Sequence, residues 1–263
     1  MQKNSFSLAL VTGATSGIGE AVSRLLAQKG IALILTGRQK EKLDSLSAEL
    51  KVPVETVAAD LSLPKERAVL AAKIRERVPD LVINNAGLSL YGDLLHSPKE
   101  KWTQMIQVNV EALTELSYEA IQALTSAKRK GVILNVASAA ARVVPFPGFT
   151  VYSASKAFVV HLSESLDAET RAHGIRVLAS CPGVVATALR ERAGGTPLTK
   201  EEQKKTMTAE FAAEQIWWQI ERRRPVYIFN WKYRLATLLT HLLPKKWVAT
   251  FTKKSIDARI KKD

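Results

Sequence analysis

Short apolar runs alternate with longer helical patterns along most of the chain. The runs carry few polar side chains and end at glycine or polar residues, which is typical of strands buried on both faces of a sheet. We predict strands at 8–12, 31–36, 54–58, 81–84, 132–136, 176–180 and 226–229. Apolar positions recur at helical spacing between them, and we predict helices at 17–29, 40–50, 64–78, 98–126, 149–173 and 209–221.

A helix between successive strands favours parallel pairing, since a parallel crossover needs a dozen or more residues. The predicted fold class is therefore α/β, a Rossmann-type doubly wound parallel sheet of seven strands with helices on both faces. Residues 1–230 are expected to form this single domain, with a polar substrate loop at 188–208, and residues 231–263 a C-terminal helical extension. Ligands of such sheets bind beyond the carboxyl ends of the strands.

Composition excludes several classes of protein. Of the 263 residues 46% are hydrophobic, which is enough for a packed core. The only cysteine is Cys181, so an intramolecular disulfide is excluded and a reducing, cytoplasmic location is expected. We expect no signal peptide and no transmembrane helix. The four histidines have no ligand spacing, so no metal site is predicted, and no nucleic-acid module is found.

The turn after the first predicted strand has the chemistry of a phosphate site. Residues 12–19 read TGATSGIG and open directly into a helix, with glycines spaced G-x-x-x-G-x-G. Glycines allow a tight turn and let a pyrophosphate approach the N–H groups at the helix N-terminus. A plain strand-to-helix turn is the alternative, but the position after the first strand favours nucleotide binding.

The ends of the next strands predict which nucleotide is bound. No acid follows the second strand, where one would bind the ribose of NAD; Arg38 stands there and can pair with a 2′-phosphate. Asp60 follows the third strand, where it can contact adenine or cap a turn. Residues 84–87, Asn-Asn-Ala-Gly, end the fourth strand and would pack against the cofactor or lock the sheet edge. A solvated Arg38 is the alternative.

Candidate catalytic residues follow the fifth strand. Ser138 comes at its end, and Tyr152 and Lys156 lie four positions apart on one face of the next predicted helix. A tyrosine is a poor acid–base group at its ordinary pKa of about 10. A nearby ammonium and an oxidised nicotinamide would lower that pKa, while Ser138 would hold a substrate oxygen. A Tyr–Lys pair alone is a weak signal, but its combination with the glycine-rich turn is specific.

These motifs together resemble those of the short-chain dehydrogenase/reductase family over roughly residues 6–230. The resemblance implies a catalytic tetrad of Asn109, Ser138, Tyr152 and Lys156, in which Tyr152 is the acid in reduction and Asn109 holds a water in the proton relay. It also implies NADP(H) as cofactor. The implied cofactor-binding residues are Gly13, Thr15, Ser16, Gly17, Ile18, Gly19, Arg38, Asp60, Leu61, Asn85, Ala86, Gly87, Tyr152, Lys156, Pro182, Gly183, Val185 and Thr187.

One departure bears on the cofactor. Many NADP-preferring members carry a basic residue just before the second glycine of the turn, where this chain has Ser16. The preference for NADP(H) therefore rests on Arg38. The expected activity is NADPH-dependent reduction of a carbonyl compound, and the apolar residues at 139–151 suggest a lipophilic substrate. A 3-oxoacyl-carrier-protein reductase and a non-catalytic NADP-binding regulator are the alternatives, and a homodimer or homotetramer is expected.

The C-terminal extension is strongly basic. Twelve Lys or Arg and three acids lie between Glu221 and Asp263, so nine of the thirteen net positive charges are there. Leucines 235, 238, 239, 242 and 243 share one helical face, and an apolar face with Trp247 and Phe251 follows Pro244. The active-site mouth, a second subunit or a membrane surface could cover these faces, so peripheral membrane association and docking to an acidic carrier protein are both considered.

Overall fold

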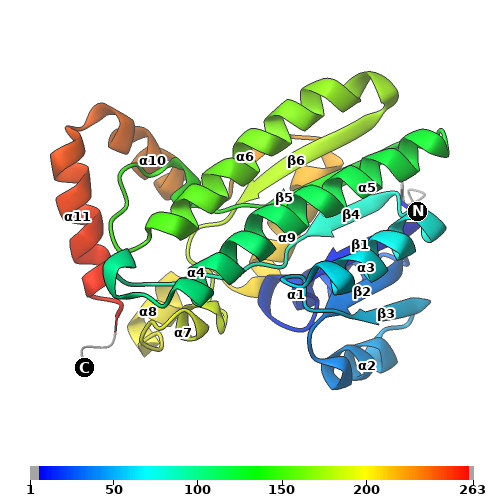
Figure 1. The fold of residues 1–263 in the computed structure, drawn as a ribbon, viewed down its shortest axis with the longest axis horizontal. Coiled ribbons are helices and arrows are strands. Elements are labelled where there is room, and N and C mark those ends of the chain that lie inside the picture. The colour runs from blue at the N-terminus through cyan, green and yellow to red at the C-terminus, as the bar shows by residue number, and fades with distance from the viewer. Residues whose placement is uncertain (1–5, 261–263) are drawn as a thin grey trace.

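The computed structural model describes residues 6–260, so the last three residues of the predicted extension lie outside it. Seven parallel strands form one sheet in the order β3-β2-β1-β4-β5-β6-β7, which confirms the predicted fold class (Figure 1). The strands are β1 Leu8–Thr12, β2 Ala32–Gly37, β3 Val54–Ala58, β4 Leu81–Asn84, β5 Gly131–Val136, β6 Ile175–Cys181 and β7 Val226–Ile228.

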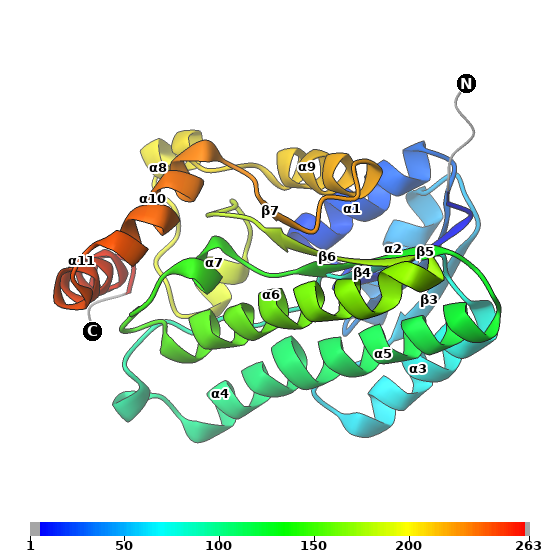
Figure 2. The same cartoon turned by 90° about the horizontal axis from the view of Figure 1, so that it is seen from above.

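Helices cover both faces of the sheet, as Figure 2 shows from above. One face carries α1 Gly17–Gln28, α2 Lys40–Glu49 and α9 Ala209–Glu221. The other carries α3 Pro64–Arg77, α4 Lys99–Ile106, α5 Leu113–Ser126 and α6 Thr150–Thr170. Because both faces are covered, every residue of β4 and β5 is buried, which explains their unbroken apolar runs.

The helix predicted at 98–126 is not continuous. A π-helical segment, Gln107–Ala112, separates α4 from α5. Such a segment adds a residue to a helical turn and often marks a functional site. Here it contains Asn109, whose side chain is fully buried. The apolar spacing at 98–126 predicted a helix correctly but carried no sign of the extra residue.

A network of buried amides and hydroxyls joins the centre of the sheet to two helices. Asn84 on β4 donates to Asn135 on β5 at 2.9 Å and to Ser117 on α5 at 3.1 Å. Asn135 in turn donates to Ser163 on α6 at 3.0 Å. Hydrogen bonds have defined directions, unlike apolar contacts, so this network sets the positions of α5 and α6 along the strands.

Asp167 anchors the far end of α6 to β6. Its carboxylate, whose side chain is 1% exposed, accepts hydrogen bonds from Arg176 at 2.7 Å, Arg171 at 2.6 Å and the Val177 N–H at 3.0 Å. Burial alone raises the pKa of Asp167, but these three donors outweigh it and lower the pKa below its ordinary value. The carboxylate therefore stays charged at neutral pH and stabilises the helix that carries Tyr152.

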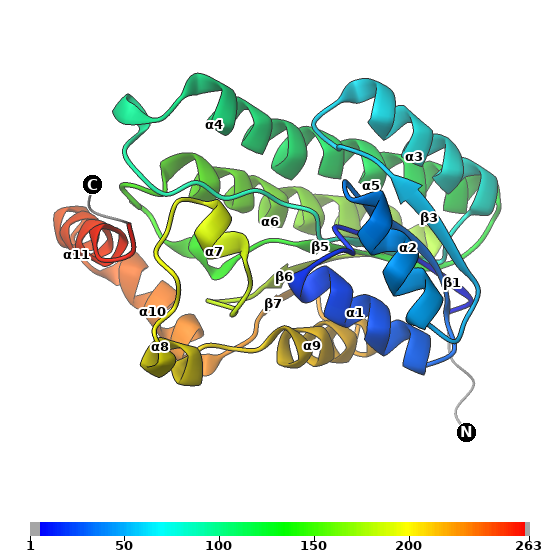
Figure 3. The same ribbon diagram turned by 90° about the horizontal axis from the view of Figure 1, so that it is seen from below.

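The C-terminal extension forms two further helices, α10 Trp231–Leu242 and α11 Lys245–Asp257. Both lie at the end of the molecule opposite β3 and α2 (Figure 3). Two threonines face the loop before α6: the Thr240 and Thr252 hydroxyls donate to carbonyls of their own helices at 2.7 Å and also lie 3.3 Å from the carbonyls of Arg142 and Pro145. The extension thus packs on the loop before α6, while the predicted leucine face stays exposed.

Replacement of Asp167 tests the anchor. We expect Asp167→Asn to lower the free energy of unfolding by about 3 kcal/mol, because two arginines lose a buried charged partner. Chemical denaturation monitored by circular dichroism measures the difference. The control is Asp44→Asn, which breaks an exposed pair with Lys40 and should change stability by less than about 1 kcal/mol. Equal effects of the two substitutions would contradict the anchoring role.

Candidate active site

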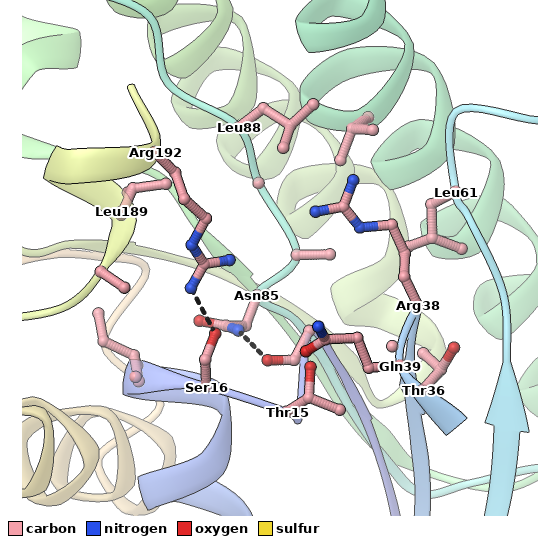
Figure 4. A pocket seen from close by; sticks show the side chains of 18 of the residues that line it. Thr15, Ser16, Thr36, Arg38, Gln39, Leu61, Asn85, Leu88, Leu189 and Arg192 are labelled. Atoms are coloured by element: carbon pink, nitrogen blue, oxygen red, sulfur yellow. Dashed lines mark hydrogen bonds between the residues drawn. The ribbon is translucent and has the colours of Figure 1, made fainter. Parts of the chain in front are cut away.

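A cavity of about 640 Å³ opens at the carboxyl ends of β1, β2 and β4. Figure 4 shows side chains from several strands and loops that point into it. The predicted cofactor residues that line it are Gly13, Thr15, Ser16, Gly17, Ile18, Arg38, Asp60, Leu61, Asn85, Ala86, Gly87 and Thr187. Thr36 also lines it, and its buried hydroxyl has no hydrogen-bond partner within residues 6–260.

The glycine-rich turn forms the floor of this cavity. Gly13 and Gly17 have φ angles of +67° and +56°, which residues other than glycine rarely adopt. The turn is held to the end of β4: the Thr12 hydroxyl accepts the N–H groups of Asn85 and Ala86, each at 2.9 Å, and the Asn85 amide donates to the Thr12 carbonyl at 2.9 Å. The Asn-Asn-Ala-Gly segment therefore locks the first turn in place as well as lining the cavity.

Two exposed arginines face each other across the cavity. Arg38 follows β2, and Arg192 ends α7 (Leu189–Arg192), where it donates to the Ser16 hydroxyl at 3.0 Å (Figure 4). Neither guanidinium has an ion-pair partner in the described part of the chain. Arg192 was not predicted, because it is 176 positions from Ser16 and only the fold brings them together. Its guanidinium places a positive charge beside Ser16, the position at which the sequence has no basic residue.

Asp60 has the turn role that the sequence left open. Its carboxylate accepts from both the N–H and the hydroxyl of Ser62, at 2.9 and 2.7 Å. It also lines the cavity, beside Leu61. Both interpretations of Asp60 are therefore compatible with the structure.

The four predicted catalytic residues converge just beneath the cavity. Ser138 follows β5, Tyr152 and Lys156 lie on the first turns of α6, and Asn109 lies in the π-helical segment. The Lys156 ammonium donates to the Val136 carbonyl at 2.8 Å and lies 5.9 Å from the centre of the Tyr152 ring.

Gly87 and Asn109 connect these residues to the cavity. A Cβ at Gly87 would be 3.3 Å from both the Lys156 nitrogen and the Asn109 oxygen, so Gly87 in the cavity wall lies directly against Lys156 and Asn109. The Asn109 side chain bonds both main-chain polar groups of Leu88, at 2.8 and 2.9 Å, and the Ser155 hydroxyl at 3.1 Å. In this arrangement Asn109 positions the loop after β4 against α6.

Burial sets the protonation of the Tyr–Lys pair. It raises the pKa of Tyr152 to about 12, an effect that the Ser138 hydroxyl partly opposes, and lowers the pKa of Lys156 to about 8. The sequence predicted that the neighbouring ammonium would lower the pKa of Tyr152. The protein's own groups do not lower it, because desolvation of the phenolate is the larger effect. A neutral phenol at neutral pH can donate a proton.

Four predicted cofactor residues lie behind the cavity rather than on its surface. Gly19 packs against the Gly13 carbonyl, and Val185 pairs with Met207. Gly183 lies against the ring of Tyr233, whose hydroxyl accepts the Val184 N–H at 3.2 Å. The sequence did not single out Tyr233, because nothing in a 49-residue separation indicates that contact. Pro182 also lies off the cavity surface, and its carbonyl accepts from the Ala139 N–H.

Tyr152 belongs to a cluster of apolar side chains that also includes Phe149, Met105 and Ile256. The Phe149 ring lies 4.4 Å from that of Tyr152 and stacks on Tyr91 at 4.8 Å, and Ile256 of α11 completes the cluster. The predicted substrate loop contains α7 and α8 (Lys200–Lys205), and its Thr196 N–H donates to the Arg259 carbonyl at 2.8 Å. The C-terminal extension therefore touches both the surroundings of Tyr152 and the predicted substrate loop.

The fold and site define a class of protein, a dinucleotide-binding α/β enzyme with a tyrosine–lysine pair beside its nucleotide cavity. The sequence profile described as short chain dehydrogenase matches residues 7–197, and the chain belongs to that family of oxidoreductases. No helix within residues 6–260 is long and apolar enough to cross a membrane.

Curated relatives and solved structures resemble most of the chain. Sulfoacetaldehyde reductase of Chromohalobacter salexigens is 35% identical, with 79% of this chain and 85% of the relative covered. Serine 3-dehydrogenase of Agrobacterium fabrum is 32% identical, with 83% and 90% covered. The structure of a short-chain dehydrogenase from Sphingobium yanoikuyae in complex with NADPH matches with a TM-score of 0.80 at 31% identity, covering 90% of this chain and 93% of that one.

The lowered pKa of Lys156 predicts a specific pH dependence of stability. Between about pH 8 and pH 10.5 the unfolded chain holds this proton while the folded protein releases it, so the free energy of unfolding rises with pH. Compared with Lys156→Met, which cannot titrate, the wild type should gain about 2–3 kcal/mol between pH 7 and pH 10. Urea denaturation of both proteins at the two pH values measures this, and a constant difference would contradict the lowered pKa.

Proposed function

We propose that this protein is an NADPH-dependent carbonyl reductase that acts on a lipophilic ketone, aldehyde or 3-oxoacyl compound. The observation that carries the proposal is the convergence of Ser138, Tyr152 and Lys156 beneath a cavity with two unpaired arginines. The cavity fits a dinucleotide phosphate: its volume is about 640 Å³, and its floor is a glycine-rich turn at a helix N-terminus. NADPH, when bound, supplies the hydride.

Tyr152 is the proton donor in this proposal. Its raised pKa keeps the phenol protonated at neutral pH, which suits reduction, where the carbonyl oxygen must gain a proton as negative charge develops on it. Ser138 holds that oxygen through its hydroxyl. Lys156 binds the ribose hydroxyls and replaces the proton that Tyr152 loses, and Asn109 holds a water in this relay. With its pKa at about 8, Lys156 exchanges protons readily.

The lipophilic substrate class rests on the surroundings of Tyr152. Phe149 packs on its ring, Tyr91 and Phe146 pack on Phe149, and Ile256 of α11 belongs to the same cluster. Apolar walls of this kind favour an apolar substrate with a single polar group to orient. A structural relative points the same way: the alcohol dehydrogenase from Comamonas testosteroni described as bulky-bulky ketone specific matches with a TM-score of 0.74 at 26% identity.

Removal of the Tyr152 hydroxyl tests the mechanism. Tyr152→Phe keeps the ring and its packing on Phe149 but loses the acid, so kcat should fall by about 10²-fold or more while NADPH affinity stays unchanged. The readout is NADPH absorbance with carbonyl compounds of increasing chain length, a series that also tests the substrate class. Tyr118→Phe, an exposed tyrosine on α5, serves as the control. A Tyr152→Phe enzyme with wild-type turnover would refute the mechanism.

Removal of each arginine tests the cofactor. Arg38→Ala should weaken NADPH by roughly ten- to a hundredfold and NADH little, since only NADPH carries the 2′-phosphate. Arg192→Ala should lower the same preference if its guanidinium also binds that phosphate, and should weaken both cofactors equally if it binds the pyrophosphate. Fluorescence titration of each variant with both cofactors provides its own control. An equal loss for both cofactors in Arg38→Ala would show that Arg38 does not bind the 2′-phosphate.

A further inference from the structure

The α10 helix has its polar and apolar faces reversed relative to a helix on a water-exposed surface. Tyr233, Thr237 and Thr240 face the protein, and two of them hydrogen-bond to its main chain. Side chains at i, i+4, i+7 and i+11 form the opposite face and are 65%, 47%, 57% and 74% exposed: Trp231, Leu235, Leu238 and Leu242. A surface helix normally turns its apolar face inward.

The α11 helix, which follows α10 in the chain, also exposes large apolar side chains. Its inward face consists of Val248, Thr252 and Ile256, all buried. Trp247 and Phe251, one turn apart on another face, are 66% and 77% exposed. We call the exposed apolar side chains of both helices the outer face. A run of large apolar side chains on this scale marks an interaction surface.

The charge around the outer face is predominantly positive. From Trp231 to Asp257, where α11 ends, the chain has six Lys or Arg and one acid, Asp257, which pairs with Lys253 at 3.4 Å. Beside α10, a second cavity of about 370 Å³ is lined by Arg142, Arg224, Arg234 and His241, with no acid in its lining. Arg142 contacts Glu164 at 3.5 Å outside that lining. Arg234, Leu238 and His241 follow each other at helical spacing, so this cationic cavity flanks the outer face.

We propose that the outer face docks on an anionic phospholipid bilayer. Its leucines and aromatic rings would enter the boundary between headgroups and acyl chains, and the surrounding cations would bind lipid phosphates, with the arginine-lined cavity as one headgroup site. A second copy of this chain is a poorer occupant, because symmetric pairing would bring six cations of each copy together with only one acid, Asp257, per copy to offset them. Both helices are too short to span the bilayer, so docking is peripheral.

The docked orientation would place the bilayer next to the active site. The inward face of α11 packs on the aromatic cluster around Tyr152 through Ile256, and Ile260 pairs with Gly195 of the substrate loop. One helix therefore carries the outer face on one side and part of the substrate wall on the other. Docking does not depend on the proposed reductase activity and can be measured without a substrate.

Vesicle binding tests the proposal. The full chain is sedimented with vesicles of phosphatidylcholine alone, and with about one-third phosphatidylglycerol, at low and high salt. We expect at least tenfold stronger binding to the anionic vesicles at low salt. Leu238→Glu with Leu242→Glu, and separately Lys246→Glu with Lys254→Glu, should each weaken it by about tenfold or more. Unchanged NADPH binding and thermal unfolding show that each variant is folded.

Matched controls separate the outer face from a general charge effect. Leu63→Glu with Val69→Glu adds the same charge at exposed apolar positions near α3, and Lys51→Glu with Lys65→Glu reverses two exposed lysines remote from α10 and α11. Both should bind vesicles within about twofold of wild type. Equal losses in the controls, or a wild type that ignores anionic vesicles at low salt, would overturn the proposal. A third outcome would also overturn it: the wild type does not bind vesicles, and Leu238→Glu with Leu242→Glu lowers the oligomer mass. That result would assign the outer face to a second copy of the chain.

Discussion

The buried hydrogen bond between Asn84 and Asn135, with the bonds that each makes to a serine, is the constraint on which the geometry of the site depends. Apolar packing between a sheet and its helices is strong but has little direction, so it tolerates small shifts along the strands. The amides, with Ser117 and Ser163, remove that freedom, since a shift of α5 or α6 by one turn, about 5.4 Å, would leave buried polar groups without partners. The two helices in turn set the positions of the π-helical segment and of the Tyr–Lys pair. The polar network at the centre of an apolar core thus determines where the predicted catalytic groups lie.

The sequence predicted the sheet well because its signals are local. Three strands, β1, β3 and β4, have the predicted bounds, and the glycine-rich turn was found from its spacing alone. The features that were missed depend on distance in space rather than in the chain. Arg192 lies beside Ser16 because the substrate loop folds over the first turn, and no periodicity encodes that contact. The π-helical segment was missed for another reason: an extra residue in one turn does not change the apolar pattern on either side of it.

The Tyr–Lys pair shows which properties of a site residue spacing can predict and which depend on burial. A separation of four residues correctly placed both side chains on one helical face, but it could not give the depth of that face. Burial penalises a phenolate and an ammonium alike, so it moves the pKa of Tyr152 upward to about 12 and that of Lys156 downward to about 8. At neutral pH the phenol is therefore neutral, and the lysine still carries its proton but loses it more easily than an exposed lysine. A neutral phenol beside a lysine of pKa about 8 is an arrangement suited to giving a proton and then regaining one.

The same contrast between local pattern and surroundings explains the C-terminal extension. Its leucine periodicity predicted an amphipathic helix but not which way the apolar side would face, because either face of a helix can be turned inward. In the structure the inward face of both helices carries threonines. Their hydroxyls bond to main-chain carbonyls, so burying these polar groups costs little free energy. The apolar side is left outward, and the two helices carry six cations but only one acid, Asp257. A surface that is both apolar and strongly basic is poorly suited to water and to pairing with a copy of itself, whereas an anionic bilayer satisfies both properties at once.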